Sequence, residues 1–191
     1  MTTLLAGITE NWPVWIVSVT LVIAAVIDGL RLKVPNWITA PMILSGLAYS
    51  AWATQAAGGG WLQGLVVGLL GAGVGLLLLL PAYAIGGMGA GDVKLLAGIG
   101  AWMHAGVTLE AFAVSALVGA VLAIVLVIYH NTWTRHRTQF WQILQEIVTI
   151  RNPDYLSMIA AERKPRMLLL PYGIPIAIGT IGYFLWNGML V

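Results

Sequence analysis

The segment Gly86-Gly-Met-Gly-Ala-Gly-Asp-Val-Lys94 places an acid and a base in a glycine-rich loop between two long apolar runs. Glycine tolerates positive backbone angles and the close approach of another chain, so Gly89 and Gly91 can hold Asp92 on a tight backbone. A carboxylate at the edge of hydrocarbon is costly to bury, and such residues are usually functional. Asp92 therefore requires a partner elsewhere in the chain, and Asp28 is the candidate.

The composition indicates an integral membrane protein. Of the 191 residues, 60% are hydrophobic and only 8% are charged, which is outside the range of soluble globular domains. Cysteine is absent, so disulfides, thiolate metal sites and a cysteine nucleophile are excluded. No Lys or Arg precedes the first apolar run, so we expect this run to be a retained membrane span and not a cleaved signal peptide.

Six apolar runs predict six transmembrane helices in a single membrane domain that covers residues 1–191. The expected fold class is therefore all-α, a polytopic membrane protein. The fourth run is short, which places its Asp92 end at the membrane boundary. The predicted spans are Trp12–Ile27, Trp37–Thr54, Trp61–Ile85, Val93–Val107, Leu109–Tyr129 and Leu168–Leu190.

Glycine and tryptophan indicate how these spans pack and where they end. The third span contains two small-xxx-small pairs, Gly64/Gly68 and Gly71/Gly75, which allow neighbouring helices to approach closely. Indole side chains favour the interface between membrane and water. The tryptophans near predicted span ends are Trp12, Trp15, Trp37, Trp61, Trp102, Trp133 and Trp186.

The nine Lys and Arg residues predict the orientation of the chain, because such residues collect in cytoplasmic loops. Two lie in the first loop, one lies beside the third loop and six lie in the fifth loop. The N-terminus, the loop 55–60, the turn 104–108 and the C-terminus contain none. Both termini are therefore expected on the outer side of the membrane.

Residues 131–167 are polar and basic, and they predict a cytoplasmic amphipathic segment before the last span. At helical period, apolar side chains from Phe140 to Ile150 fill one half of a helix, while glutamines, Glu146 and Thr149 fill the other. This pattern is typical of an interfacial helix. Anchorage to membrane lipid is the favoured interpretation, and contact with a substrate or a partner protein stays open.

Topology singles out two of the seven acids. Asp28 follows the first predicted span and Asp92 precedes the fourth, so the chain crosses the membrane twice between them and both acids face the cytoplasm. Two close carboxylates in a low-dielectric site share a proton. As in an aspartic protease, one can take a proton from an attacking water while the other donates a hydrogen bond to the scissile carbonyl. No metal or cofactor is required.

Simpler interpretations of these residues stay open. Asp92 is well placed to cap the fourth helix, and Asp28 could pair with Arg31 or Lys33. Lys94 could anchor its loop at the cytoplasmic face. It could also influence the ionisation of Asp92 or bind a substrate carbonyl.

Other residues and other functions were also weighed from the sequence. Pro35 and Asn36 are typical of a turn that begins the second span, and contact with a substrate is the second interpretation. The three histidines lack metal-ligand spacing, so no metal site is expected.

A small transporter or proton-relay subunit could use Asp28 and Asp92 as an ion site, and a structural subunit could use them as helix caps.

Three motifs occur in order along the chain. Asp28-Gly-Leu-Arg-Leu-Lys-Val-Pro-Asn36 follows the first span, Gly86–Ala97 contains Gly-x-Gly-Asp-x-Lys, and Pro171-Tyr-Gly-Ile-Pro-Ile-Ala-Ile-Gly179 opens the last span. Together they resemble the type IV prepilin peptidases, which are Gly-x-Gly-Asp membrane aspartic proteases. The short form here is most similar to the peptidases of tight-adherence (Flp) pilus systems.

The resemblance implies an endopeptidase that removes the leader of type IV pilin-like precursors at the cytoplasmic face of the inner membrane, in pilus biogenesis and protein secretion. Its expected partners are these precursors and membrane lipid, not nucleic acid. As a separate hypothesis, either Gly64–Gly75 of the third span or the short fourth span leaves room for the substrate helix. The resemblance makes Asp28 and Asp92 catalytic, with support from Gly89, Gly91, Lys94, Pro35 and Asn36.

The resemblance also bears on a second activity. The larger bifunctional prepilin peptidases have a cysteine-rich insertion between the first two spans and N-methylate the new N-terminus. Here only Gly29–Asn36 occupies that position, and the chain has no cysteine. N-methyltransferase activity is therefore not expected.

Overall fold

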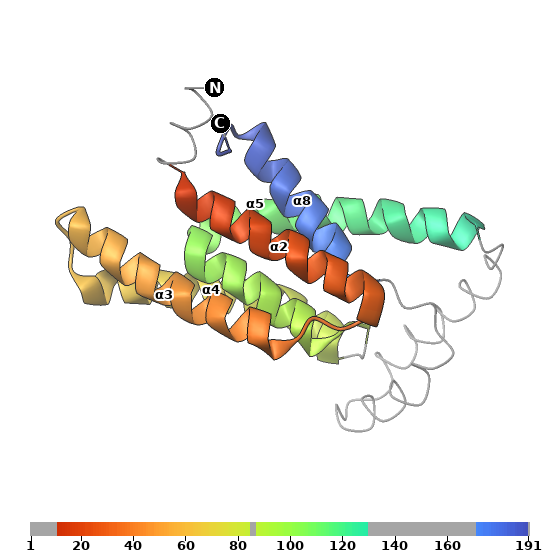
Figure 1. Cartoon of the computed structure of the whole chain (residues 1–191), viewed down its shortest axis with the longest axis horizontal. Coiled ribbons are helices and arrows are strands. Elements are labelled where there is room, and N and C mark those ends of the chain that lie inside the picture. Colours follow the sequence, from red (N-terminus) through yellow and green to blue (C-terminus); the bar gives the residue numbers. More distant parts are fainter. Residues whose placement is uncertain (1–10, 85–86, 130–170, 191) are drawn as a thin grey trace.

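The computed structural model describes residues 11–84, 87–129 and 171–190, and the regular structure in these ranges is helical (Figure 1). The predicted all-α fold class is confirmed. The first helix extends past the predicted end at Ile27, so Asp28 lies within it. The described helices are α2 (Trp12–Arg31), α3 (Asn36–Ala56), α4 (Trp61–Ala84), α5 (Ala90–Tyr129) and α8 (Gly173–Trp186).

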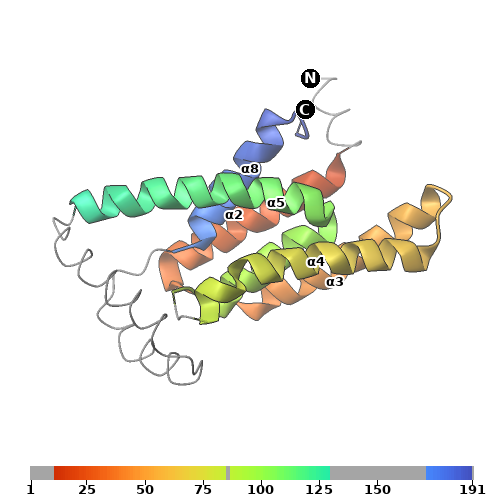
Figure 2. The same ribbon diagram turned by 180° about the vertical axis from the view of Figure 1, so that it is seen from behind.

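α5 is broken at His104, where φ 64° and ψ 176° lie outside the helical region. The chain reverses direction at this point, as Figures 1 and 2 show from opposite sides. The first half of α5 lies against α4 and the second half lies against α8. The break falls in the predicted turn 104–108, where the Ser50 Oγ lies 3.1 Å from the His104 Nε2.

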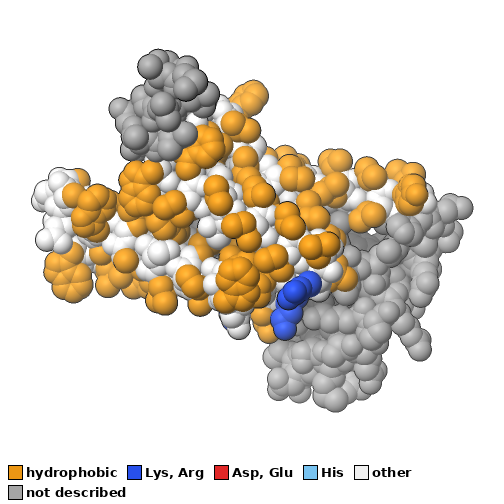
Figure 3. Space-filling model, in the orientation of Figure 1, with side chains coloured by type: hydrophobic (Ala, Val, Ile, Leu, Met, Phe, Trp, Pro, Cys, Tyr) orange, Lys and Arg blue, Asp and Glu red, His pale blue; other side chains and the backbone are white. Residues whose placement is uncertain are grey.

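Three described helices are long and apolar enough to cross a membrane, namely α2, α4 and the Ala90–Leu126 part of α5. Apolar side chains cover the face in Figure 3, and large ones such as Val26 and Leu117 are exposed. Water would disfavour this surface, whereas hydrocarbon accepts it. Lys and Arg side chains gather near the connection between α2 and α3 (Figure 3). The count of six spans stays a prediction.

The first half of α5 is the centre of the core. α5 contacts each of the other described helices. Leu95, Leu96 and Ile99 are fully buried within this half. Because α5 begins only two residues before Asp92, this packing fixes the position of that acid.

Glycines in α4 provide the close contacts that hold α5 in place. A Cβ at Gly71 would lie 2.1 Å from the Gly100 carbonyl oxygen, and one at Gly75 would lie 2.3 Å from the Leu96 carbonyl oxygen. Gly64 meets α3 in the same way, since its Cβ would lie 2.2 Å from the Ser50 carbonyl oxygen. The predicted packing role of these glycines is confirmed. Neighbouring helices occupy the space at Gly64, Gly71 and Gly75, whereas no atom lies within 4 Å of a Cβ at Gly73. Room for a substrate helix beside this span or the fourth stays a prediction.

Trp102 is not the interfacial residue that its position near a span end predicted. Its side chain is only 5% exposed, and its ring stacks on Tyr49 with a centroid distance of 5.0 Å. Its indole N–H donates a hydrogen bond to the Met42 carbonyl oxygen at 2.9 Å. Trp37 and Trp186, by contrast, are 66% and 90% exposed, as interfacial residues should be.

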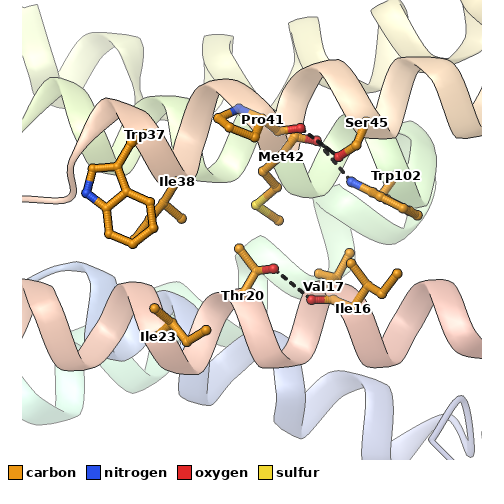
Figure 4. A pocket seen from close by; sticks show the side chains of 10 residues that line it. All are labelled: Ile16, Val17, Thr20, Ile23, Trp37, Ile38, Pro41, Met42, Ser45 and Trp102. Carbon is orange, nitrogen blue, oxygen red and sulfur yellow. Dashed lines mark hydrogen bonds between the residues drawn. The ribbon is translucent and has the colours of Figure 1, made fainter.

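A cavity of about 240 Å³ lies between α2 and α3 (Figure 4). The hydroxyls of Thr20 and Ser45 face this space, and both are already used. Thr20 donates to the Ile16 carbonyl oxygen at 2.8 Å, and Ser45 donates to the Pro41 carbonyl oxygen at 2.6 Å. The cavity therefore presents an apolar surface.

The amphipathic segment predicted at about 131–167 lies outside the described residues. Its role as a lipid anchor stays a prediction, and so does the single-domain organisation over residues 1–191.

Two glycines of α4 provide a matched test of the packing. Gly71→Ala forces a Cβ into backbone of α5, whereas Gly73→Ala places one where no atom lies within 4 Å. We expect Gly71→Ala to destabilise the protein by about 1–3 kcal/mol, because a close-packed interface cannot absorb the added methyl group. Gly73→Ala should be neutral or slightly stabilising, since alanine favours helix. Thermal unfolding in detergent measures both, and equal melting temperatures would contradict the packing described here.

Candidate active site

Asp28 lies in the last turn of α2 and is buried, with 3% of its surface exposed. Its Oδ2 accepts a hydrogen bond from the Gly173 N–H at 2.8 Å. This N–H belongs to the first residue of α8, where helical N–H groups lack partners within the helix. Asp28 is therefore held by the start of α8, whereas Arg31 and Lys33, the simpler partners that the sequence left open, are exposed.

Gly173 cannot be replaced without moving one of the two helices. A Cβ at this position would lie 2.9 Å from both the Cβ and the Oδ2 of Asp28. Glycine is required here because the start of α8 lies so close to Asp28. The same close approach brings the Gly173 N–H within hydrogen-bonding distance of the carboxylate. The Pro171-Tyr-Gly motif thus has a physical role in holding Asp28.

Asp92 is the third residue of α5 and is 6% exposed. Its Oδ2 accepts a hydrogen bond from the Gly89 N–H at 3.3 Å, which satisfies a free donor just before the helix. Asp92 is not the N-cap residue of this helix, because it is the third helical residue. Its side chain nevertheless caps the helix by reaching back to the N–H of Gly89, the residue before the helix. The Oδ1 of Asp92 is buried and has no hydrogen-bond partner among the described residues.

Gly91 is needed for close approach and not for a positive backbone angle. A Cβ at Gly91 would lie 2.5 Å from the Val34 carbonyl oxygen and 2.9 Å from the Val34 Cβ. Among the described glycines, the positive φ angles belong to Gly58 and Gly188. The connection before α3 is therefore packed directly on the first turn of α5, which carries Asp92.

Asp28 and Asp92 come from helices that α3 and α4 separate in the chain. Asp28 at the end of α2 and Asp92 at the start of α5 are close enough for their charges to interact. The charge of Asp92 also acts on the phenol of Tyr172, the residue before Gly173. The carboxylates and this phenol thus lie in one region, near the end of α2 and the starts of α5 and α8. Within the described ranges, no group of three or more metal-ligating side chains is present.

The remaining predicted site residues link α3 to α5. Pro35 precedes α3 in an extended conformation, and Asn36 is the first residue of the helix. The Lys94 Nζ donates a hydrogen bond to the Asn36 Oδ1 at 3.0 Å, and both side chains are exposed. These residues join the two helix starts at the surface, beside the buried acids.

Reasoning from the sequence missed Tyr172, Gly173 and Val34 as parts of this site. A signal for the first two existed, because Pro171–Gly179 had already been identified as a motif. Val34 also belonged to an identified motif, Asp28–Asn36, but its contact with Gly91 depends on how the connection between α2 and α3 is folded and was not predictable.

The two motif glycines provide a contrast that tests this geometry. Gly91→Ala should destabilise the protein by about 1–3 kcal/mol, since its Cβ would overlap Val34 backbone. Gly89→Ala should be tolerated, because its Cβ would lie 3.4 Å from the Asp92 Oδ2, an ordinary contact. The melting temperature of each variant in detergent checks this expectation. If Gly89→Ala proved the more damaging change, the close approach of Val34 would not be the reason for the motif.

Comparison with known proteins identifies the family. Residues 15–124, which include both acids, match the type IV leader peptidase family. The prepilin leader peptidase/N-methyltransferases of Burkholderia pseudomallei strains 1026b and K96243 are each 32% identical to this chain over 106 residues. This region covers 56% of the chain and 32% of each relative, so the chain spans about a third of the length of the curated relatives it matches. No solved structure matches. Because the family match covers more than half of its length, the chain belongs to the type IV leader peptidase family.

Proposed function

We propose that this protein is an aspartic endopeptidase that removes the leader of type IV pilin-like precursors at the cytoplasmic face of the inner membrane. The observation that carries the proposal is the meeting of two buried carboxylates, Asp28 and Asp92, at the ends of separate helices. Membership in the type IV leader peptidase family supports a peptidase, and the named activity of the curated relatives supports a prepilin substrate.

The two acids are held differently, which suits a pair that shares one proton. Asp28 is fixed by the Gly173 N–H. Among the described residues Asp92 is held through its Oδ2, so its buried Oδ1 can accept a ligand or carry a proton. A pair of this kind provides one acid and one base without further groups.

The proposed reaction is hydrolysis of one peptide bond. The ionised carboxylate takes a proton from water, and the water oxygen forms a bond to the scissile carbonyl carbon. The protonated carboxylic acid donates a hydrogen bond to the carbonyl oxygen, which becomes negatively charged. When the carbon–nitrogen bond breaks, a proton passes to the leaving amine, and the pair returns to its singly protonated state.

The position of the acids within their helices suits a precursor that is cut at the membrane boundary. A short basic leader followed by an apolar helix would place the cleavage site where the predicted spans meet the cytoplasm. The placement of both termini outside belongs to this proposal. Precursors of tight-adherence (Flp) pili are the proposed substrate class, and membrane lipid surrounds the enzyme.

A transporter or proton relay is the less favoured alternative. Intramembrane ion sites of transporters usually lie near the midplane, often between broken helices. Here Asp28 is in the last turn of α2 and Asp92 is in the first turn of α5. We also propose that this chain lacks N-methyltransferase activity, because only Leu32–Pro35 connects α2 to α3.

Cleavage by carboxamide variants tests the proposed chemistry. Asp28→Asn and Asp92→Asn should each lower the rate of leader removal by at least about 100-fold, because an amide can act neither as base nor as acid. Purified enzyme in detergent is mixed with a pilin-like precursor, and the product is measured by gel mobility and by the mass of its new N-terminus. That mass should include no added methyl group when a methyl donor is present.

Glu110→Gln is the matched control. Glu110 is an exposed carboxylate that accepts a hydrogen bond from the Tyr183 hydroxyl, away from the paired acids. This variant should cleave at the wild-type rate, and all three variants should unfold cooperatively. Near-wild-type cleavage by either aspartate variant would show that the acid is structural and would overturn the two-aspartate mechanism.

A further inference from the structure

Tyr172 is placed beside Asp28 by the backbone. It precedes α8, and the next residue, Gly173, donates its N–H to the Asp28 Oδ2 at 2.8 Å. A Cβ at Gly173 would lie only 2.9 Å from this carboxylate oxygen, so the start of α8 is in close contact with the acid. Tyr172 is therefore the direct neighbour of the residue that holds Asp28.

Tyr172 also lies near the segment that holds Asp92. Its side chain and that of Met88 line the same cavity. Met88 precedes Gly89, whose N–H donates a hydrogen bond to the Asp92 Oδ2 at 3.3 Å. The negative charge of Asp92 acts on the phenol, in agreement with this placement. The phenol is therefore close to the supports of both carboxylates.

The phenol has a fixed ring and an unused hydroxyl. The ring of Tyr172 is partly buried and packs against the hydrophobic core, so packing defines its position. Among the described residues, its hydroxyl has no hydrogen-bond partner. The O–H group is therefore available to donate to a substrate.

Three other donors near the acids are already used. The Gly89 and Gly173 N–H groups each donate to a carboxylate. The Lys94 Nζ donates to the Asn36 Oδ1 at the surface. An oxygen that becomes negative during a reaction is stabilised by donors that are in place beforehand. The Tyr172 hydroxyl is such a donor, and the acids do not need it for their own support.

We propose that Tyr172 is a third catalytic residue, whose hydroxyl donates a hydrogen bond to the scissile carbonyl oxygen as that oxygen becomes negatively charged. The inference rests on the proposed peptidase function. The phenol and the protonated carboxylic acid share the stabilisation of this oxygen, while the ionised carboxylate takes the proton from water. Tyr172 keeps its own proton throughout, so the proton balance of the proposed hydrolysis is unchanged.

Tyr172→Phe tests this role, because it removes the hydroxyl and keeps the ring in its packing. The hydrogen bond strengthens in the transition state, so its loss should lower kcat for leader removal by about 100-fold. KM should stay close to the wild-type value, since binding of the uncut precursor does not depend on this bond. Tyr183→Phe is the matched control from the same helix, because that hydroxyl is bound to Glu110, away from the acids. It should cleave at the wild-type rate.

The pH dependence of kcat separates a chemical role from a packing role. A difluorinated tyrosine at position 172 keeps the ring and the hydroxyl but is a stronger acid than tyrosine. A phenol donates only while it is protonated, so this enzyme should lose activity at a lower pH than wild type as the pH rises. The same replacement at position 183 should leave the pH profile unchanged.

Each other outcome contradicts a defined part of the proposal. If wild type does not cleave the precursor, the proposed function fails and the role of Tyr172 fails with it. If wild type cleaves but Tyr172→Phe keeps its kcat, or raises KM alone, Tyr172 is not a donor to the carbonyl oxygen and the peptidase function stands. If Tyr172→Phe unfolds at the assay temperature, the fluorinated enzyme decides, and an unshifted pH profile would overturn the proposal.

Discussion

The hydrogen bond from the Gly173 N–H to the Asp28 Oδ2 is the contact on which the site depends. A buried carboxylate is costly without a donor, and the first N–H of a helix is unsatisfied without an acceptor. The carboxylate therefore accepts the hydrogen bond that the helix N–H needs to donate. Hydrogen bonds to charged groups contribute about 1.5–3 kcal/mol to stability. The contact also holds Tyr172, the residue before Gly173, at the start of α8 next to Asp28.

The second acid is positioned by packing instead of by a single bond. Asp92 lies in the first turn of a helix whose first half is held by α4 through Gly71 and Gly75, and Val34 packs on Gly91 in the same turn. Its remaining hydrogen bond, to Gly89, is long at 3.3 Å and leaves Oδ1 without a described partner. The site thus combines Asp28, which is held by a short hydrogen bond, with Asp92, whose Oδ1 has no described hydrogen-bond partner. This difference suits the proposed acid–base pair.

Much of this arrangement followed from the sequence for simple reasons. Apolar runs between polar turns predicted the helices, and counting membrane crossings predicted that Asp28 and Asp92 face the same side, since the side depends only on the number of crossings. The partner of Asp28 was not predictable, because Arg31 and Lys33 are nearer in the chain and Gly173 arrives only through the packing of α8. Trp102 was misplaced for a similar reason. Its position near a span end suggested the interface, but the ring is covered by Tyr49 and its N–H is satisfied inside the core.

The most direct test of the account is whether residues 28 and 92 lie together in the membrane-embedded protein. Because the chain has no cysteine, the double variant Asp28→Cys/Asp92→Cys can be cross-linked in membranes with a short thiol-specific reagent, with Asp28→Cys/Glu110→Cys as the control. Mass spectrometry then identifies the linked peptides. The account predicts a cross-link within one chain between positions 28 and 92 and none between 28 and 110. Absence of the 28–92 link, in protein whose single cysteines both react with the reagent, would contradict the paired site.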